Sequence, residues 1–224
     1  KKPFYSIFTM RMRQPIVAFV GHIDHGKTSL QDYIRHSSTA KTEAGLITQH
    51  IGSTNIPLET VKKICGSLLE ALRLKITIPG ILLIDTPGHA AFTNLRKRGG
   101  SLADLAILVV SIKEGIKPQT AEVLQILKTY KTPFLIALNK LDTLSGWKSD
   151  SKGLKESIEN QSPHITQEFQ EAFLIFQSAL AAHGFESDLY YEINDFTKKI
   201  AIVPCSAKTG EGICELLFVL SGLC

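Results

Sequence analysis

The chain has 224 residues, of which 44% are hydrophobic and 21% are charged, and its formal net charge is +4. This length and composition predict a soluble globular protein with one large domain or a domain with an insertion, and they exclude a disordered, fibrous or repeat protein. The four cysteines lack zinc-finger spacing and no apolar run reaches the ~18 residues of a membrane span, so we expect reduced thiols, a cytoplasmic location and no membrane partner.

A glycine-rich loop follows the first expected strand. Residues 1–14 indicate a short N-terminal extension, and the apolar strand at Ile16–Val20 leads directly into Gly21–Thr28, which has the pattern Gly-x-x-x-x-Gly-Lys-Thr. A tight loop between a strand and a helix points backbone N–H groups inward, and the helix N-terminus adds positive potential. The pattern therefore predicts a phosphate-binding loop, in which Lys27 reaches the β- and γ-phosphates and the Thr28 hydroxyl binds Mg²⁺.

Strand and helix signals alternate along the rest of the chain, which predicts an α/β fold with a six-stranded, mostly parallel sheet and helices on both faces. The turn at Pro79-Gly80 predicts one antiparallel edge pair, formed by the strands on either side of it. The expected strands are Ile16–Val20, Leu74–Ile78, Ile81–Asp85, Leu105–Ser111, Phe134–Asn139 and Ile200–Cys205. The expected helices are Lys27–His36, Leu58–Leu72, Ala90–Gly99, Pro118–Tyr130, His164–His183 and Gly212–Leu220.

Polar motifs stand where several expected strands end. In an open parallel sheet, ligands bind beyond the carboxyl ends of the strands. Asp85-Thr86-Pro87-Gly88-His89 follows the third strand. Asp85 can hold Mg²⁺ there, and the Gly88 N–H can approach the γ-phosphate because no side chain blocks it.

The motif Asn139-Lys140-Leu141-Asp142 follows the fifth expected strand and predicts the base. The Asp142 carboxylate can accept hydrogen bonds from N1–H and the 2-amino group of guanine, and adenine lacks these donors. A site of this kind rejects the analogue without the donors by a factor of ~10⁴. We expect Asn139 to tie the base to the phosphate loop and the Lys140 stem to cover the ring. Ser206-Ala207-Lys208, after the last strand, would offer backbone N–H groups to guanine O6.

In this order, these motifs resemble those of the translational GTPases over nearly the whole chain. More narrowly they resemble the G domain of the initiation factor 5B family, the archaeal and eukaryotic relatives of bacterial initiation factor 2. The helix at Leu58–Leu72 and a long segment at Thr143–Lys199, which we expect to be an insertion, favour that branch. The stretches that carry the resemblance are Gly21–Thr28, Gly45–Gly52, Asp85–Phe92, Leu95–Gly100, Lys117–Thr120, Asn139–Asp142, Asp195–Thr197 and Ile202–Gly212.

The resemblance implies a P-loop GTPase fold and ribosome-stimulated GTP hydrolysis during the joining of ribosomal subunits. It implies a single G domain over residues 1–224, with the downstream family domains outside this chain. The implied partners are the factor-binding region of the large ribosomal subunit and, through those other domains, initiator tRNA. Direct DNA binding is not expected.

Roles carry over from the family onto matching positions. His89 resembles the catalytic histidine that orients the attacking water. Thr48 resembles the switch-one threonine, which closes on Mg²⁺ and the γ-phosphate. Ile23 and Ile47 resemble an apolar gate that keeps the histidine from the nucleotide, and Asp24 is placed to hold a monovalent cation. The complete nucleotide-binding set is Asp24, His25, Gly26, Lys27, Thr28, Ser29, Gly88, Asn139, Lys140, Asp142, Ser206, Ala207 and Lys208, and the metal set is Thr28, Thr48 and Asp85.

Other functions fit parts of this pattern. One is another translational GTPase, such as a tRNA-delivering elongation factor, against which Gly45–Gly52 and the Thr143–Lys199 segment argue. Another is a GTP-dependent interaction switch without meaningful turnover. A P-loop kinase or ATPase is opposed by Asp142. Ser111 stands where the family commonly has an aspartate, and we assign no role to this difference.

Overall fold

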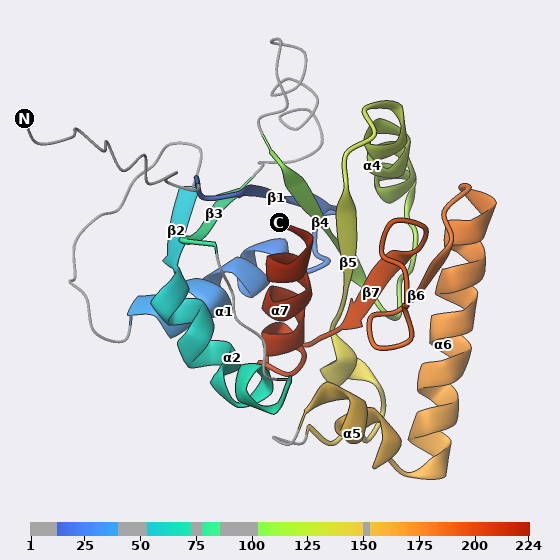
Figure 1. Ribbon diagram of the computed structural model, residues 1–224. Coiled ribbons are helices and arrows are strands. Elements are labelled where there is room, and N and C mark those ends of the chain that lie inside the picture. The colour runs from blue at the N-terminus through green and yellow to red at the C-terminus, as the bar shows by residue number, and fades with distance from the viewer. Residues whose placement is uncertain (1–12, 40–52, 73–77, 86–102, 150–152) are drawn as a thin grey trace, which may run out of the picture.

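The computed structural model describes residues 13–39, 53–72, 78–85, 103–149 and 153–224. In these ranges a seven-stranded sheet lies at the centre of the molecule (Figure 1), with the strand order β2-β3-β1-β4-β5-β7-β6. The mostly parallel α/β fold is confirmed, with seven strands where six were expected. The strands are β1 (Ile16–Gly21), β2 (Ser53–Pro57), β3 (Gly80–Asp85), β4 (Leu105–Ser111), β5 (Phe134–Asn139), β6 (Ser187–Leu189) and β7 (Ile200–Pro204).

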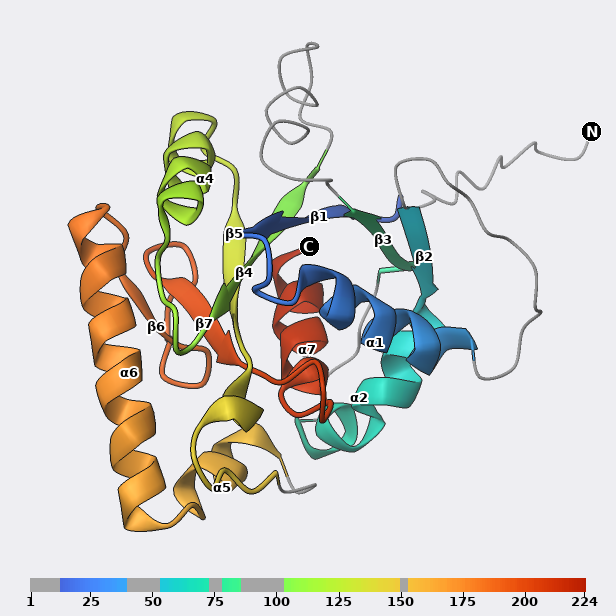
Figure 2. The ribbon, with the colours of Figure 1, turned by 180° about the vertical axis from the view of Figure 1, so that it is seen from behind.

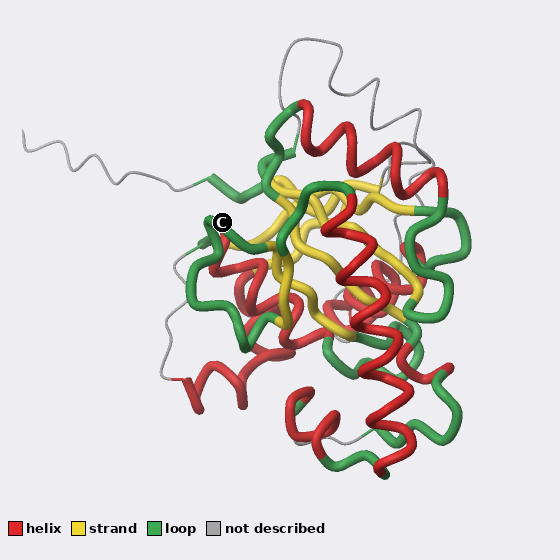
Figure 3. The backbone as a smooth tube through the Cα atoms, turned by 90° about the vertical axis from the view of Figure 1, so that its right-hand side faces the viewer, coloured by secondary structure: helices red, strands yellow, loops and turns green. Residues whose placement is uncertain are grey.

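Helices cover both faces of the sheet, as expected. Helices α1 (Lys27–Thr39), α2 (Leu58–Leu72) and α7 (Ile213–Leu223) share one face, where α2 packs against both α1 and α7. Helices α4 (Pro118–Thr129) and α6 (Pro163–Ala182) lie on the other side (Figures 1 and 2). Viewed from the side, the strands lie between these two groups (Figure 3). None of the helices in the described ranges is both long and apolar enough to cross a membrane.

The centre of the sheet is built from apolar runs. Every residue of β4 and every residue of β5 is buried. Strands covered on both faces become continuous apolar runs rather than alternating ones, and Leu105–Ser111 and Phe134–Asn139 have that composition. Their parallel pairing continues to the ends of both strands, where Ser111 is opposite Asn139. The buried core therefore fixes the position of Asn139, the polar residue at the carboxyl end of β5.

One strand pairing expected from the sequence is wrong. The antiparallel partner of β3 is Ser53–Pro57, and the other neighbour of β3 is β1, so no side of β3 is free for Leu74–Ile78. Most of Leu74–Ile78 lies outside the described residues, and Ile78 is in a bend. A strand containing Asn and Pro is weak in propensity, but Pro is tolerated at a sheet edge because the missing N–H is not needed there.

The Thr143–Lys199 segment contains more structure than one helix. It begins within η1 (Leu141–Thr143), a 3₁₀ turn, and continues through α5 (Leu154–Glu159), α6 and the edge strand β6. In α6, Phe169, Phe173 and Phe176 recur at helical spacing and are all buried, so this face of the helix belongs to the core. Helix α5 lies beyond the carboxyl end of β5 (Figure 1). The helix expected at Ala90–Gly99 lies outside the described residues.

Candidate functional site

The glycine-rich loop connects β1 to α1 at the carboxyl edge of the sheet, as the sequence predicts. Gly26 has φ +91°, and a Cβ on it would lie 2.3 Å from Nδ2 of Asn139. Only glycine therefore fits both the backbone conformation and the close approach of β5. Asp24 also has a left-handed backbone (φ 67°). Thr28 and Ser29 are exposed on the first turn of α1, and Ile23 is 59% exposed.

The ammonium group of Lys27 is held beside this loop. Its Nζ donates hydrogen bonds to the carbonyl oxygens of Gly21, at 2.9 Å, and His22, at 2.7 Å. Leu30 N donates to Gly26 O at 2.9 Å, which starts the helix directly behind the loop. A positive side chain and a helix N-terminus therefore meet at one point, a combination that favours a bound anion.

Asn139 joins the phosphate loop to the loop that follows β7. The side chain is buried, Nδ2 donates to His25 O at 2.9 Å, and Oδ1 accepts from Ala207 N at 3.0 Å. The amide thus uses its donor and its acceptor on two segments far apart in the sequence. One side chain at the end of β5 fixes the distance between them.

Asp142 and Ser206 form the next contact on this side. Ser206 Oγ donates to Asp142 Oδ1 at 2.6 Å, and Ser206 Oγ itself accepts from the backbone N–H groups of Lys208 and Thr209 at 3.3 and 3.2 Å. Lys140 has a left-handed backbone (φ 71°), and its Nζ lies 3.5 Å from Glu114 Oε1. The residues predicted to contact the base therefore lie together, where the segments that follow β5 and β7 meet.

Asp85, at the end of β3, is placed by its backbone alone. Asp85 is the last residue of β3 and pairs in register with Phe19 of β1, which places it at the same edge as the phosphate loop. Nothing is described of its side chain. Four predicted site residues lie outside the described residues, namely Ile47, Thr48, Gly88 and His89.

Three side chains near the predicted residues had no role predicted from the sequence. Gln119 Oε1 lies 2.6 Å from His22 Nδ1, and Glu114 Oε2 lies 3.7 Å from His25 Nε2. Glu211 accepts hydrogen bonds from the Thr143–Lys199 segment. Gln119 and Glu211 stand in motifs that carried the family resemblance, which was the available signal. No pattern marked Glu114.

His25 is fully buried beneath this loop, beside His22 at a ring-centroid distance of 5.0 Å. Burial lowers the pKa of His25 to about 4, because removal from water disfavours the charged imidazolium more than Glu114 stabilises it. The ring is therefore neutral near pH 7. A neutral His25 adds no positive charge to the anion site.

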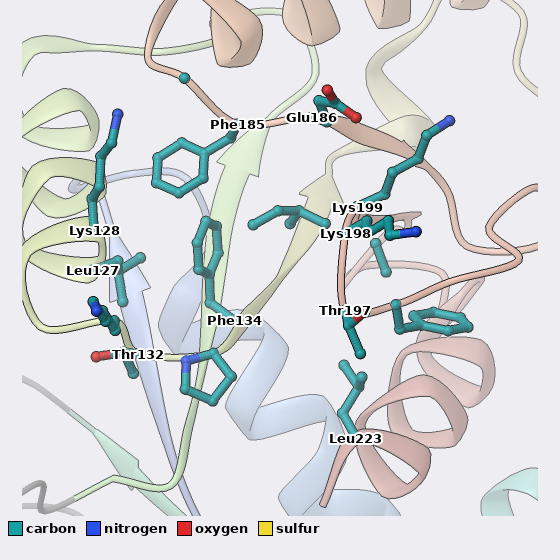
Figure 4. A pocket seen from close by; sticks show the side chains of 16 residues that line it. Leu127, Lys128, Thr132, Phe134, Phe185, Glu186, Thr197, Lys198, Lys199 and Leu223 are labelled. Carbon is teal, nitrogen blue, oxygen red and sulfur yellow. The ribbon is translucent and has the colours of Figure 1, made fainter.

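A groove at the opposite edge of the sheet is a separate feature (Figure 4). It has a volume of about 550 Å³ and includes the first residues of β5 and β7, Phe134 and Ile200. None of the predicted site residues lines it. Three of the four lysines that line it have partners: Lys128 Nζ donates to His183 O at 3.0 Å, Lys199 Nζ donates to Asp188 Oδ2 at 3.1 Å, and Lys198 Nζ lies 3.4 Å from Asp195 Oδ2.

Known proteins are similar to this chain in both sequence and fold. The chain is 55% identical over 213 residues to the probable translation initiation factor IF-2 of Methanopyrus kandleri and 50% identical over 215 residues to that of Methanobrevibacter smithii. These alignments cover 95% and 96% of this chain but only 36% of each relative. The crystal structure of GDP-bound aIF5B from Aeropyrum pernix matches with a TM-score of 0.85 and 50% identity, over 95% of this chain and 36% of that one.

The family model of the Elongation factor Tu GTP binding domain matches residues 12–223. The match includes the loop at Gly21–Thr28, the base-side turn at Asn139–Asp142 and the Ser206–Lys208 loop. The chain belongs to the Elongation factor Tu GTP binding domain family.

Proposed function

We propose that this chain binds guanine nucleotides and hydrolyses GTP as the G domain of a translation initiation factor that promotes the joining of ribosomal subunits. One observation carries the proposal: Asn139 links the phosphate loop to the Ser206–Lys208 loop, beside the Ser206–Asp142 hydrogen bond. The similarity of the chain to factors named IF-2 and to a GDP-bound aIF5B supports translation initiation as the process.

Guanine would be read by the residues on the base side. The Asp142 carboxylate would accept from N1–H and the 2-amino group, the Lys140 stem would cover the ring, and amides of Ser206–Lys208 would face O6. Asp142 Oδ1 is already oriented by Ser206. Adenine would leave this carboxylate unpaired, and that mismatch is the source of base selectivity.

The phosphates would be held by the loop amides from Asp24 to Ser29, by Lys27 and by the Gly88 N–H. Mg²⁺ fits the oxygen donors of Thr28, Thr48 and Asp85, because it prefers hydroxyl, carboxylate and phosphate oxygens. The exposed Thr28 on α1 and the position of Asp85 beside β1 agree with such a site. When bound, Mg²⁺ would neutralise charge on the β- and γ-phosphates. A monovalent cation at Asp24 is part of the proposal.

Hydrolysis would depend on His89, which would orient water for in-line attack on the γ-phosphorus. Thr48 would close over the γ-phosphate, and Ile23 with Ile47 would form the apolar gate. The high exposure of Ile23 supports this role, because an apolar side chain at the mouth of a phosphate loop is free to contact another segment. The ribosome would supply the stimulus, through the factor-binding region of its large subunit.

Contacts with initiator tRNA are proposed for a full-length factor rather than for these residues alone. The chain spans 36% of the length of the relatives described above. Initiator tRNA would be contacted through domains outside this chain, and the protein would act in the cytoplasm, where ribosomes are.

His89→Ala tests the chemistry. We expect unchanged GDP affinity and at least a hundredfold loss of ribosome-stimulated turnover, within the ~10²–10⁴-fold range of positioned catalytic groups. Single-turnover hydrolysis of labelled GTP, with and without ribosomal subunits, measures the loss, and competition by ATP measures base selectivity. Full stimulated turnover in the variant would contradict the role of His89. Binding without turnover in the wild type would instead identify a non-catalytic switch.

A further inference from the structure

The two segments that carry the base-side residues are joined at three successive points. Leu141 N donates to Cys205 O at 3.1 Å, Ser206 Oγ donates to Asp142 Oδ1 at 2.6 Å, and Trp147 Nε1 donates to Glu211 Oε2 at 2.8 Å. Strands β5 and β7 are parallel neighbours, so the segments that follow them start side by side. The third contact lies beyond the residues proposed to read guanine. It extends the pairing of the two segments past Asp142.

Glu211 is the centre of this third contact. Its side chain is buried at 9% exposure, and it also accepts from Ser149 Oγ, at 2.8 Å, and from Ser157 Oγ of α5. A buried carboxylate is costly unless hydrogen bonds replace its water. All three of these donors belong to the Thr143–Lys199 segment. An apolar side chain would fill the same space without that cost, so the carboxylate suggests a requirement for fixed geometry rather than for packing.

The backbone of Glu211 connects this cluster to the base side. Ser206 N donates to Glu211 O at 2.9 Å, and Gly210 N donates to Ser206 O at 2.8 Å. Gly212 has φ +74°, and a Cβ there would lie 2.1 Å from Pro204 O, so the loop closes tightly on the end of β7. A displacement of Glu211 would therefore move Ser206, whose hydroxyl orients Asp142.

We propose that Glu211 is a positioning residue for guanine recognition, which clamps the Thr143–Lys199 segment to the Ser206–Lys208 loop and so holds Asp142 in place. The proposal rests on the proposed guanine-binding function. Glu211 does not touch the base; it acts through Ser206. Because coupling between sites is reciprocal, binding of guanine must in turn stabilise the contacts of Trp147 and Ser157.

Glu211→Gln tests the clamp with little change of shape. The amide keeps one acceptor oxygen for Trp147 and Ser149, but its N–H₂ group can only donate, so the Ser157 hydroxyl must turn to accept from it. All of these hydrogen bonds also lose the charge of the carboxylate. We expect GDP to bind about tenfold more weakly, as for the weakening of hydrogen bonds to a charged group. Inosine diphosphate lacks the 2-amino group and gains less from a well-placed Asp142, so the ratio of GDP to inosine diphosphate affinity should fall. Glu156→Gln, an exposed change of the same charge on α5, is the matched control and should leave both affinities unchanged.

Hydrogen exchange supplies a readout that a purely structural role would not move. In the wild-type chain, GDP should slow exchange at residues 144–149 and 153–158 as well as at Gly21–Thr28. In Glu211→Gln the protection at residues 144–149 and 153–158 should be lost, and the protection at Gly21–Thr28 should be kept. A merely structural Glu211 would lower the affinities for GDP and inosine diphosphate equally, and that result would overturn the proposal.

Two further variants guard against misfolding. Trp147→Phe and Ser157→Ala each remove one donor to the carboxylate and leave Glu211 in place. If Glu211→Gln does not fold, a reduced affinity ratio in these variants supports the clamp, and a wild-type ratio in both refutes it. Failure of the wild-type chain to bind GDP at all would instead refute the proposed function, so the two failures are distinguishable.

Discussion

At the scale of single residues, the candidate site depends on polar side chains that the core holds in fixed positions. Asn139 is buried, and its amide makes hydrogen bonds to two loops at once. A buried amide with both ends paired has little freedom to rotate, because each lost bond leaves a desolvated group behind. The distance between the phosphate loop and the Ser206–Lys208 loop is therefore set before any nucleotide binds.

His25 makes the stability of the chain depend on pH. Its pKa is about 4 in the folded chain, lowered by burial, and about 6.5 in an unfolded chain. Between these values the unfolded state binds more protons, so the contribution is fully present above pH 6.5 and is lost as the pH falls toward 4. We expect the free energy of unfolding to decrease by about 2 kcal/mol between pH 7.5 and pH 5 from this group.

Urea unfolding at the two pH values measures this difference. In His25→Gln the decrease should be smaller by about the same amount. His164→Gln, the same replacement at an exposed histidine, is the control for the substitution itself. An identical decrease in wild type and His25→Gln would show that other groups are responsible.

At the scale of elements, α6 shows how a helix in the Thr143–Lys199 segment is anchored. Phe176 is 2% exposed, whereas Leu174 on the same helix is 58% exposed. Phe176→Ala should lower the free energy of unfolding by about 3–5 kcal/mol, because it removes a buried ring and leaves a cavity. Leu174→Ala should cost less than about 1 kcal/mol, because most of that side chain is already in water. Chemical denaturation of the two variants compares them, and equal costs would contradict the assigned helix face.

Elements with strong hydrophobic patterns could be predicted from the sequence, and weak ones could not. The apolar runs of β1, β4 and β5 and the helical spacing in α6 each gave the correct element. Strand β2 (Ser53–Pro57) was missed because only Ile56 among its residues is buried, so its sequence has no apolar pattern. Its pairing with β3 comes from tertiary context, which overrides weak local propensity.

At the scale of the whole molecule, the parallel sheet explains why separate motifs make one site. The ends of β1, β3, β5 and β7 meet at one edge, so the order of the motifs along the chain predicted their meeting in space. The contacts of Glu114, Gln119 and Glu211 could not be predicted in this way, because each depends on which loops pack together. Spacing identifies the groups that would contact a ligand, whereas the side chains that support them are determined by packing between distant segments.

A nucleotide that binds several strand ends should stabilise the whole chain. A ligand bound only by the folded state adds about 2.7 kcal/mol at a concentration of a hundred times its Kd. For a chain of this size we expect GDP at that concentration to raise the Tm by roughly 5–10 °C. ADP at the same concentration should raise it by less than about 1 °C, because a site that rejects adenine ~10⁴-fold remains almost empty. Thermal unfolding followed by circular dichroism measures both shifts in the same buffer. Equal shifts with GDP and ADP would show that the phosphates alone are recognised, and would contradict a base-selective Asp142.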